Sequence, residues 1–149
     1  MTKTNISDKS DSKVKNMEKI GILVDSTSLT RTELGNYPFV KVVSLYVSID
    51  GEHRKEVEIT PEEMTEYLHK SKHLGTSQPS PGDFMEKYEE FHKEGYTNVL
   101  VVTLSDRLSG TYQSAMVAKT MADWEMDISI HAPHVASFGV ANGVCVLAE

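Results

Sequence analysis

Two short, uninterrupted apolar runs constrain the fold of this chain most strongly. They are "IGILVD" at 20–25 and "TNVLVVTLS" at 97–105, and neither shows the alternation of a half-exposed strand. Runs of this kind are typical of strands buried on both faces, as in parallel sheets. Because helix-like segments lie between and after them, the sequence predicts an α/β fold with a mostly parallel sheet flanked by helices.

Two helix starts are marked by the same pattern of residues. Thr60 and Ser80 are each followed by proline and then, at the third position, by the acidic residues Glu63 and Asp83. A hydroxyl side chain that caps the helix, with an acid three residues later, forms a capping box, and proline is favoured at the first helical position. We therefore expect helices from 61 and from 81, the second ending at Gly95.

The remaining elements are predicted from weaker signals. We expect an extended segment at 40–50 that ends in a hairpin turn at Asp50-Gly51, a helix through Ala115 and Trp124, and a strand at 126–130. The segment 73–84 is interpreted as a loop between two helices. A last helix is expected at 138–149, and its apolar surface either packs back on the sheet or is covered by a second half that this chain lacks.

Composition excludes several classes of protein. A net charge of −7 and a pI near 5.3 argue against a nucleic-acid surface, and no apolar run reaches the roughly 18 residues that a membrane span needs. The single cysteine excludes a disulfide framework, and the six histidines form no cluster that indicates a metal site. The polar segment 1–18 is predicted to be a disordered tail without a secretory signal, so we expect a cytoplasmic protein.

Candidate site residues follow the predicted strands. The carboxyl ends of parallel strands meet at one edge of a sheet, where ligands usually bind. Three polar segments meet that description, and they are rich in hydroxyl groups and poor in cations: Asp25, Ser26, Thr27 and Ser28; Thr76, Ser77 and Gln78; and the segment 105–114. In the last segment, Gly110 allows a ligand to approach the backbone, and the first amides of the following helix suit an anion.

Each of these residues also has a purely structural interpretation. Ser109 is equally consistent with an ordinary helix cap, Thr76 and Ser77 with a turn before a proline, and Asp25 with a cap or a loop contact. The sequence contains no phosphate loop, dinucleotide-binding motif, nucleophile elbow or zinc-protease motif. An anion-binding pocket is therefore favoured over a catalytic one, and a small hydrolase or transferase with Ser109 as nucleophile is the alternative.

Four motifs together resemble the amino-terminal half of DegV-family proteins. They are "ILVDSTSLT" at 22–30, "ITPEEMTEYL" at 59–68, "TSQPSPGDF" at 76–84 and "LSGTYQSA" at 108–115. The resemblance covers 19–149. It implies a bacterial protein that binds a long-chain fatty acid without a cofactor or metal, and that is not itself an enzyme. It also implies an ATP-dependent fatty acid kinase as partner, which would phosphorylate the presented carboxylate.

The resemblance also assigns roles to individual residues. Thr76 and Ser109 are expected to contact the carboxylate of the fatty acid, with three further residues beside it and three more at the border of the pocket. The neighbours are Ser77, Gly110 and Thr111, and the border residues are Asp25, Ser26 and Thr27.

Two departures from the family pattern concern the second half of the protein. Family members are about twice as long, so 19–149 is expected to be the amino-terminal α/β domain, with the carboxy-terminal domain absent. Ala132-Pro133 stands where the family has an Asp-Ser pair. A truncated remnant that no longer retains lipid is therefore a further alternative.

Overall fold

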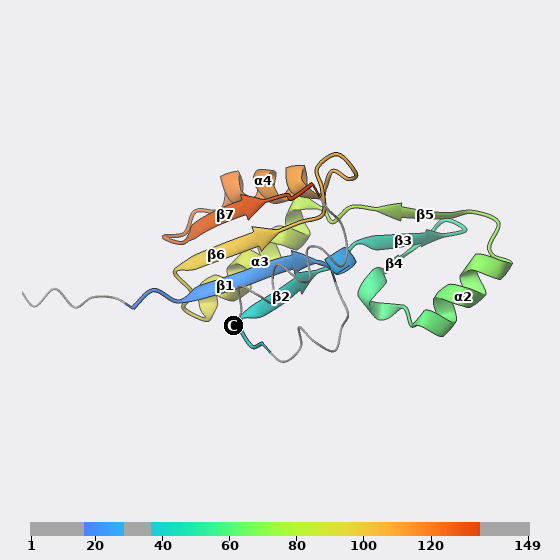
Figure 1. The fold of residues 1–149 in the computed structure, drawn as a ribbon, viewed down its shortest axis with the longest axis horizontal. Coiled ribbons are helices and arrows are strands. Elements are labelled where there is room, and N and C mark those ends of the chain that lie inside the picture. The colour runs from blue at the N-terminus through green and yellow to red at the C-terminus, as the bar shows by residue number, and fades with distance from the viewer. Residues whose placement is uncertain (1–16, 29–36, 135–149) are drawn as a thin grey trace, which may run out of the picture.

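The computed structural model describes residues 17–28 and 37–134, and its centre is a parallel sheet (Figure 1). The order of strands in this sheet is β2-β1-β6-β7, and every neighbouring pair is parallel. The strands are β1 (Ile20–Asp25), β2 (Val40–Val43), β6 (Asn98–Val102) and β7 (Asp127–His131). The predicted α/β fold with a mostly parallel sheet is confirmed, and both apolar runs form the two central strands.

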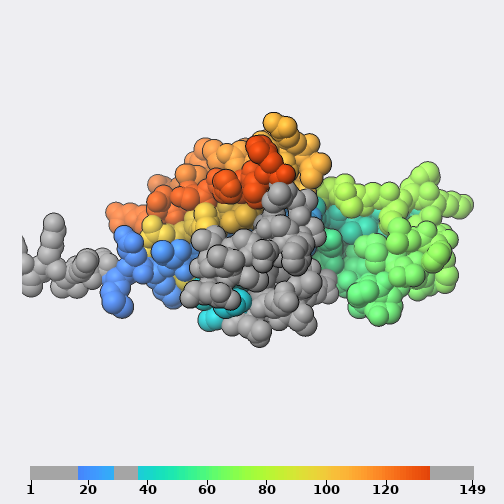
Figure 2. Space-filling model, viewed as in Figure 1, coloured from blue at the N-terminus to red at the C-terminus, as the bar shows by residue number. Residues whose placement is uncertain are grey.

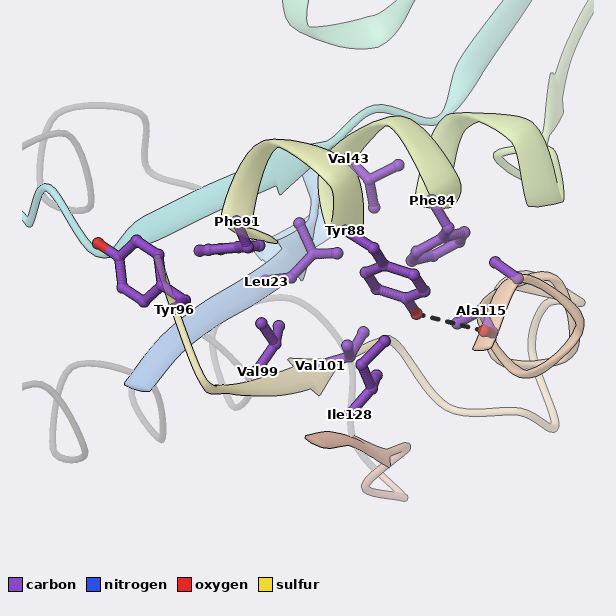
Figure 3. Packing of buried hydrophobic residues seen from close by; sticks show 11 residues of the cluster. Leu23, Val43, Phe84, Tyr88, Phe91, Tyr96, Val99, Val101, Ala115 and Ile128 are labelled. Atoms are coloured by element: carbon purple, nitrogen blue, oxygen red, sulfur yellow. Dashed lines mark hydrogen bonds between the residues drawn. The ribbon is translucent and has the colours of Figure 1, made fainter. Parts of the chain in front are cut away.

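Helices α3 (Pro81–Lys93) and α4 (Thr111–Met121) pack with the sheet to form the main hydrophobic core (Figure 3). The aromatic residues of α3, Phe84, Tyr88 and Phe91, have no exposed surface. The Tyr88 hydroxyl donates a hydrogen bond to the backbone carbonyl of Ala115 in α4 at 3.2 Å. This bond provides an acceptor for a buried hydroxyl group and joins the two helices over the sheet.

A second, antiparallel sheet extends beyond the carboxyl edge of the first, and with helix α2 (Pro61–Lys70) it forms the green lobe in Figure 2. Its strand order is β4-β3-β5. The strands are β3 (Tyr46–Ile49), β4 (Glu52–Lys55) and β5 (Leu74–Ser77), and short 3-10 turns lie at η1 (Ser26–Ser28) and η2 (Glu56–Glu58). The interpretation of 73–84 as a loop was therefore wrong in its first part, because 74–77 pairs with β3.

The local signals for caps and turns are confirmed. Thr60 and Ser80 each accept a hydrogen bond from the backbone of the acid three residues later, and each acid bonds back, so both capping boxes are complete. The turn between β3 and β4 has positive φ at Asp50 (50°) and Gly51 (95°), as a tight two-residue hairpin requires. Gly95, with φ of 79°, follows the end of α3.

Three expectations needed correction. The extended segment at 40–50 is two strands, because the chain passes from the parallel to the antiparallel sheet at Ser44 and Leu45. The helix expected to reach Trp124 ends at Met121, and the Trp124 ring stacks on His92 at 5.6 Å instead. A third difference concerns 73–84, whose first part is strand β5 instead of loop.

Some expectations fall on residues that the structure does not describe. The predicted helix at 138–149, which contains the single cysteine, lies outside the described residues, as does nearly all of the tail predicted at 1–18. Within 17–28 and 37–134, no helix is both long and apolar enough to cross a membrane.

Candidate functional site

A pocket of about 640 Å³ lies where the carboxyl edge of the parallel sheet meets the antiparallel sheet. Strands β1 and β6 are neighbours and parallel, so the segments that follow them leave the sheet on the same side. Strands β3 and β5 provide the opposite wall. The lining residues are Thr27, Leu45, Tyr46, Val47, Glu56, Thr76, Ser77, Gln78, Leu104, Leu108, Ser109 and Gly110.

The structure brings five of the eight predicted site residues to this pocket. They come from three separate segments: Thr27 follows β1, Thr76 and Ser77 lie on β5, and Ser109 and Gly110 precede α4. The other three, Asp25, Ser26 and Thr111, lie behind the lining and are buried. Residues from all three predicted segments therefore line one pocket, and the other three predicted residues lie behind its lining.

Asp25 holds together the segments that follow β1 and β6. One carboxylate oxygen accepts bonds from the backbone and hydroxyl of Thr27, and the other accepts from the backbone of Leu104 at 2.6 Å. Asp25 has no exposed surface, and burial raises the pKa of this carboxyl group, although the hydrogen bonds from Thr27 and Leu104 act in the opposite direction. Asp25 therefore makes both contacts, a cap-like bond to Thr27 at the start of η1 and a bond to the segment that follows β6.

Ser26 connects the parallel sheet to the antiparallel sheet. Its hydroxyl accepts a hydrogen bond from the backbone of Leu45 at 2.9 Å and donates one to the carboxylate of Glu56. Leu45 lies in the link between β2 and β3, and Glu56 begins η2. Since Leu45 and Glu56 both line the pocket, this buried serine fixes the position of one wall.

Ser109 lies at the start of α4 but is not its cap residue. The cap position is Gly110, and the Ser109 hydroxyl lies 2.9 Å from the hydroxyl of Thr111 and accepts a bond from the Thr111 backbone at 3.3 Å. The first amides of a helix have no intrahelical acceptor. The pocket therefore has hydroxyl groups beside the positive end of a helix, which suits an acidic or hydrogen-bonding head group.

Gln78 belongs to one of the three polar segments singled out in the sequence, where it had no individual role, and it lines the pocket. Its side-chain amide donates to the Ser114 hydroxyl at 3.3 Å, and it lies against Gly110 so closely that a Cβ there would be 2.2 Å from Oε1. The close approach that the sequence assigned to a ligand at Gly110 is therefore made by Gln78. No periodic pattern could have revealed this contact, because Gln78 lies in a proline-bounded link between β5 and α3.

This contact predicts an interaction energy between the two positions. Gly110→Ala should lower the free energy of unfolding in the wild-type background, because the new methyl group displaces the Gln78 amide. In a Gln78→Ala background the same substitution should cost less, giving a coupling of about 0.5–1 kcal/mol in a double-mutant cycle. Urea denaturation of the four proteins measures it, and strictly additive effects would contradict the contact.

Glu56 is the one side chain among the described lining residues whose carboxylate could serve as a general base. Among the described residues, no lysine, arginine or histidine lines it, and no group of three or more metal-ligating side chains occurs. The closest contacts of Ser109 are with Thr111, which is not a general base at neutral pH. The apolar side chains of the lining, such as Leu104 and Leu108, leave room for an apolar group beside the hydroxyls.

These features define an α/β domain with a hydroxyl-lined pocket at the carboxyl edge of its parallel sheet. The chain belongs to the DegV family, described as uncharacterised proteins, whose family model matches residues 19–149. A DegV domain-containing protein of Caldanaerobacter subterraneus is 38% identical over 132 residues, which are 88% of this chain and 46% of the relative. The chain spans about half the length of the curated relatives it matches.

Solved structures of the same family share this fold. A DegV lipid-binding protein from Thermotoga maritima is 34% identical with a TM-score of 0.74, and the match covers 86% of this chain and 46% of that one. A fatty-acid-binding DegV family protein from Thermus thermophilus is 36% identical with a TM-score of 0.71, covering 87% and 45% of the two chains.

Proposed function

We propose that this chain binds a long-chain fatty acid and holds its carboxyl group with the hydroxyls of Thr76 and Ser109. The observation that carries the proposal is their convergence: Thr76 on β5 and Ser109 before α4 line one pocket, although 33 positions separate them in the sequence. The fatty-acid and lipid binding of the Thermus and Thermotoga relatives supports the choice of ligand.

A ligand with a long apolar chain and one carboxyl group suits a pocket that is lined by both leucine and valine side chains and hydroxyl groups. Burial of the acyl chain contributes roughly 0.8 kcal/mol for each CH₂ group, so it supplies most of the affinity. The head group needs hydrogen-bond donors, because a buried carboxyl group without partners is costly. The hydroxyls of Thr76, Ser77 and Ser109, which line the pocket, supply these donors.

We further propose that a bound carboxyl group is presented to a fatty acid kinase, which would transfer a phosphoryl group to it from ATP. Thr76 and Ser77 are exposed, so a head group beside them is within reach of a partner protein. The relatives are about twice as long as this chain. Presentation of the carboxyl group to a kinase is therefore proposed for a full-length DegV protein that contains a domain like this one.

Substitution of the two hydroxyl residues tests the head-group assignment. Thr76→Ala and Ser109→Ala should each weaken fatty-acid binding by roughly 10-fold to 100-fold, since a hydrogen bond to a charged group contributes about 1.5–3 kcal/mol. Matched controls are Thr65→Ala on α2 and the exposed Ser129→Ala on β7, neither of which lines the pocket. Unchanged affinity in the Thr76/Ser109 double variant would show that the head group binds elsewhere.

The same proteins distinguish a carrier from an enzyme. A carrier should release no product from fatty-acid esters, with or without Ser109. Ester turnover that disappears in Ser109→Ala but persists in Ser129→Ala would instead favour the hydrolase alternative.

A further inference from the structure

The side chain of Gln78 joins the two sides of the proposed head-group pocket. Gln78 follows β5 directly, two residues after Thr76, and the chain there passes close to the loop that precedes α4 (Figure 1). The side-chain amide donates a hydrogen bond to the Ser114 hydroxyl at 3.3 Å. A Cβ on Gly110 would overlap the Oε1, Cδ and Nε2 atoms of this amide. The amide therefore packs on the backbone of α4's first residues, next to Ser109.

The backbone on both sides of Gln78 is held in place. A residue before proline is restricted to extended conformations, and the proline that follows, Pro79, is buried. Ser80, the next residue, caps α3 in a complete capping box. In the other direction, Thr76 pairs with Val47 of β3. Gln78 is thus joined to α3 and to the antiparallel sheet by its main chain, and to α4 by its side chain.

The sheet hydrogen bonds do not fix the position of β5 relative to α4. Among the described residues, β5 is an edge strand in the order β4-β3-β5, and all four of its residues are exposed. Pairing with β3 sets the register of Thr76 along the strand. Ser109 is held separately, by its contacts with Thr111 of α4. The Gln78 side chain is a direct link between these two sets of contacts.

We propose that Gln78 is a positioning residue, which holds Thr76 and Ser109 at the separation at which both hydroxyls bond to one carboxyl group. The inference rests on the proposed function and adds a residue that acts through the two hydroxyls without touching the ligand. A carboxyl group presents two separate oxygen atoms, one to each hydroxyl, whereas an alcohol presents a single oxygen. Loss of the Gln78 amide should therefore weaken the binding of an acid more than that of an alcohol, because the two hydroxyls are no longer ordered before the ligand binds.

The test measures the binding of dodecanoic acid and dodecanol to the wild-type chain and three variants. Gln78→Ala removes the amide, and Gly110→Ala displaces it without altering Gln78 itself. Gln113→Ala is the matched control, since Gln113 is an exposed glutamine on α4, next to Ser114, that does not line the pocket. Circular dichroism establishes that each variant is folded.

Gln78→Ala and Gly110→Ala should each weaken acid binding about tenfold and alcohol binding less than about twofold, while Gln113→Ala should change neither. In a Thr76→Ala background, where one of the two hydroxyls is already absent, Gln78→Ala should cause less than about a twofold further loss of acid binding. A full tenfold further loss there would show that Gln78 contacts the ligand directly. Equal losses for acid and alcohol would show a general effect on the shape of the pocket. Either result would overturn the positioning role.

The same titrations separate this inference from the proposed function. If Thr76→Ala and Ser109→Ala weaken acid binding but Gln78→Ala and Gly110→Ala do not, the role of Gln78 fails and the head-group assignment stands. If Thr76→Ala and Ser109→Ala bind dodecanoic acid as the wild-type chain does, or if no protein binds it, the proposed function fails and the positioning role fails with it.

Discussion

Replacing Phe91 by alanine is expected to lower the free energy of unfolding by about 3–5 kcal/mol, the range for removing a large buried aromatic side chain. Phe91 has no exposed surface, and its ring lies 5.1 Å from Tyr96 in an edge-to-face arrangement. On its other side, the backbone of β1 is so close that a Cβ at Gly21 would be 2.4 Å from the ring. The cavity cannot close readily, because strand and helix are both held by their own hydrogen bonds.

Urea denaturation followed by circular dichroism measures this change. Met121→Ala is the control, since Met121 is 61% exposed at the end of α4 and its truncation should change stability by less than about 0.5 kcal/mol. Equal losses in the two variants would mean that α3 does not pack on the sheet as described.

Replacing Asp25 by asparagine is expected to lower the free energy of unfolding by about 1–3 kcal/mol at acidic to neutral pH. Both carboxylate oxygens accept bonds from backbone N–H groups, those of Thr27 and Leu104. An asparagine side chain has one acceptor oxygen and one NH₂ group, so in either orientation its NH₂ group faces the backbone N–H of Thr27 or of Leu104. Since Thr27 and Leu104 line the pocket, the same substitution should also weaken ligand binding.

The pH dependence of the Asp25 effect has a definite sign. Burial raises the pKa of Asp25 above its unfolded value of 3.8, so the folded state binds this proton more tightly than the unfolded state does. The stability that comes from this tighter proton binding is fully present below the unfolded pKa of Asp25, and it is lost as pH rises through the folded pKa. The difference in unfolding free energy between wild type and Asp25→Asn should therefore shift against wild type over that window.

An exposed acid provides the control for this measurement. Asp123→Asn should leave the pH profile of stability close to that of wild type, because Asp123 lies on the surface after α4. A stability difference between wild type and Asp25→Asn that stays constant, or grows in favour of wild type, over the same pH window would contradict a pKa of Asp25 raised by burial.

The sequence predicted those strands and helix starts that depend on residues close together in the chain. Uninterrupted apolar runs gave the central strands, and Thr60 and Ser80 gave the helix starts, because burial on both faces and capping depend on neighbouring residues. Strand β5 has no such signal. Its only large apolar residue is Leu74, it is exposed throughout, and its pairing with β3 depends on a partner about 28 positions earlier in the chain.

The same distinction explains the candidate site. Thr27 and Ser109 were candidates because they follow β1 and β6, whose ends meet at one sheet edge, whereas Thr76 lies within β5 and was a candidate through its motif. Glu56 lines the pocket where the Ser26 hydroxyl bonds to it and joins η2 to the end of β1. The Gln78 amide occupies the space that Gly110 leaves beside it. Those contacts join distant segments, and no periodic pattern in the sequence records them.

Lipid retention by the natively purified chain tests the central claim most directly. Organic extracts of the wild-type protein and of the Thr76→Ala, Ser109→Ala double variant are compared by mass spectrometry, with the Thr65→Ala, Ser129→Ala double variant as control and a longer DegV protein as positive reference. The account predicts a fatty acid in the wild-type and control extracts and little or none in the Thr76/Ser109 variant. An empty wild-type chain beside a loaded longer protein, or equal lipid in all of the variants, would contradict it.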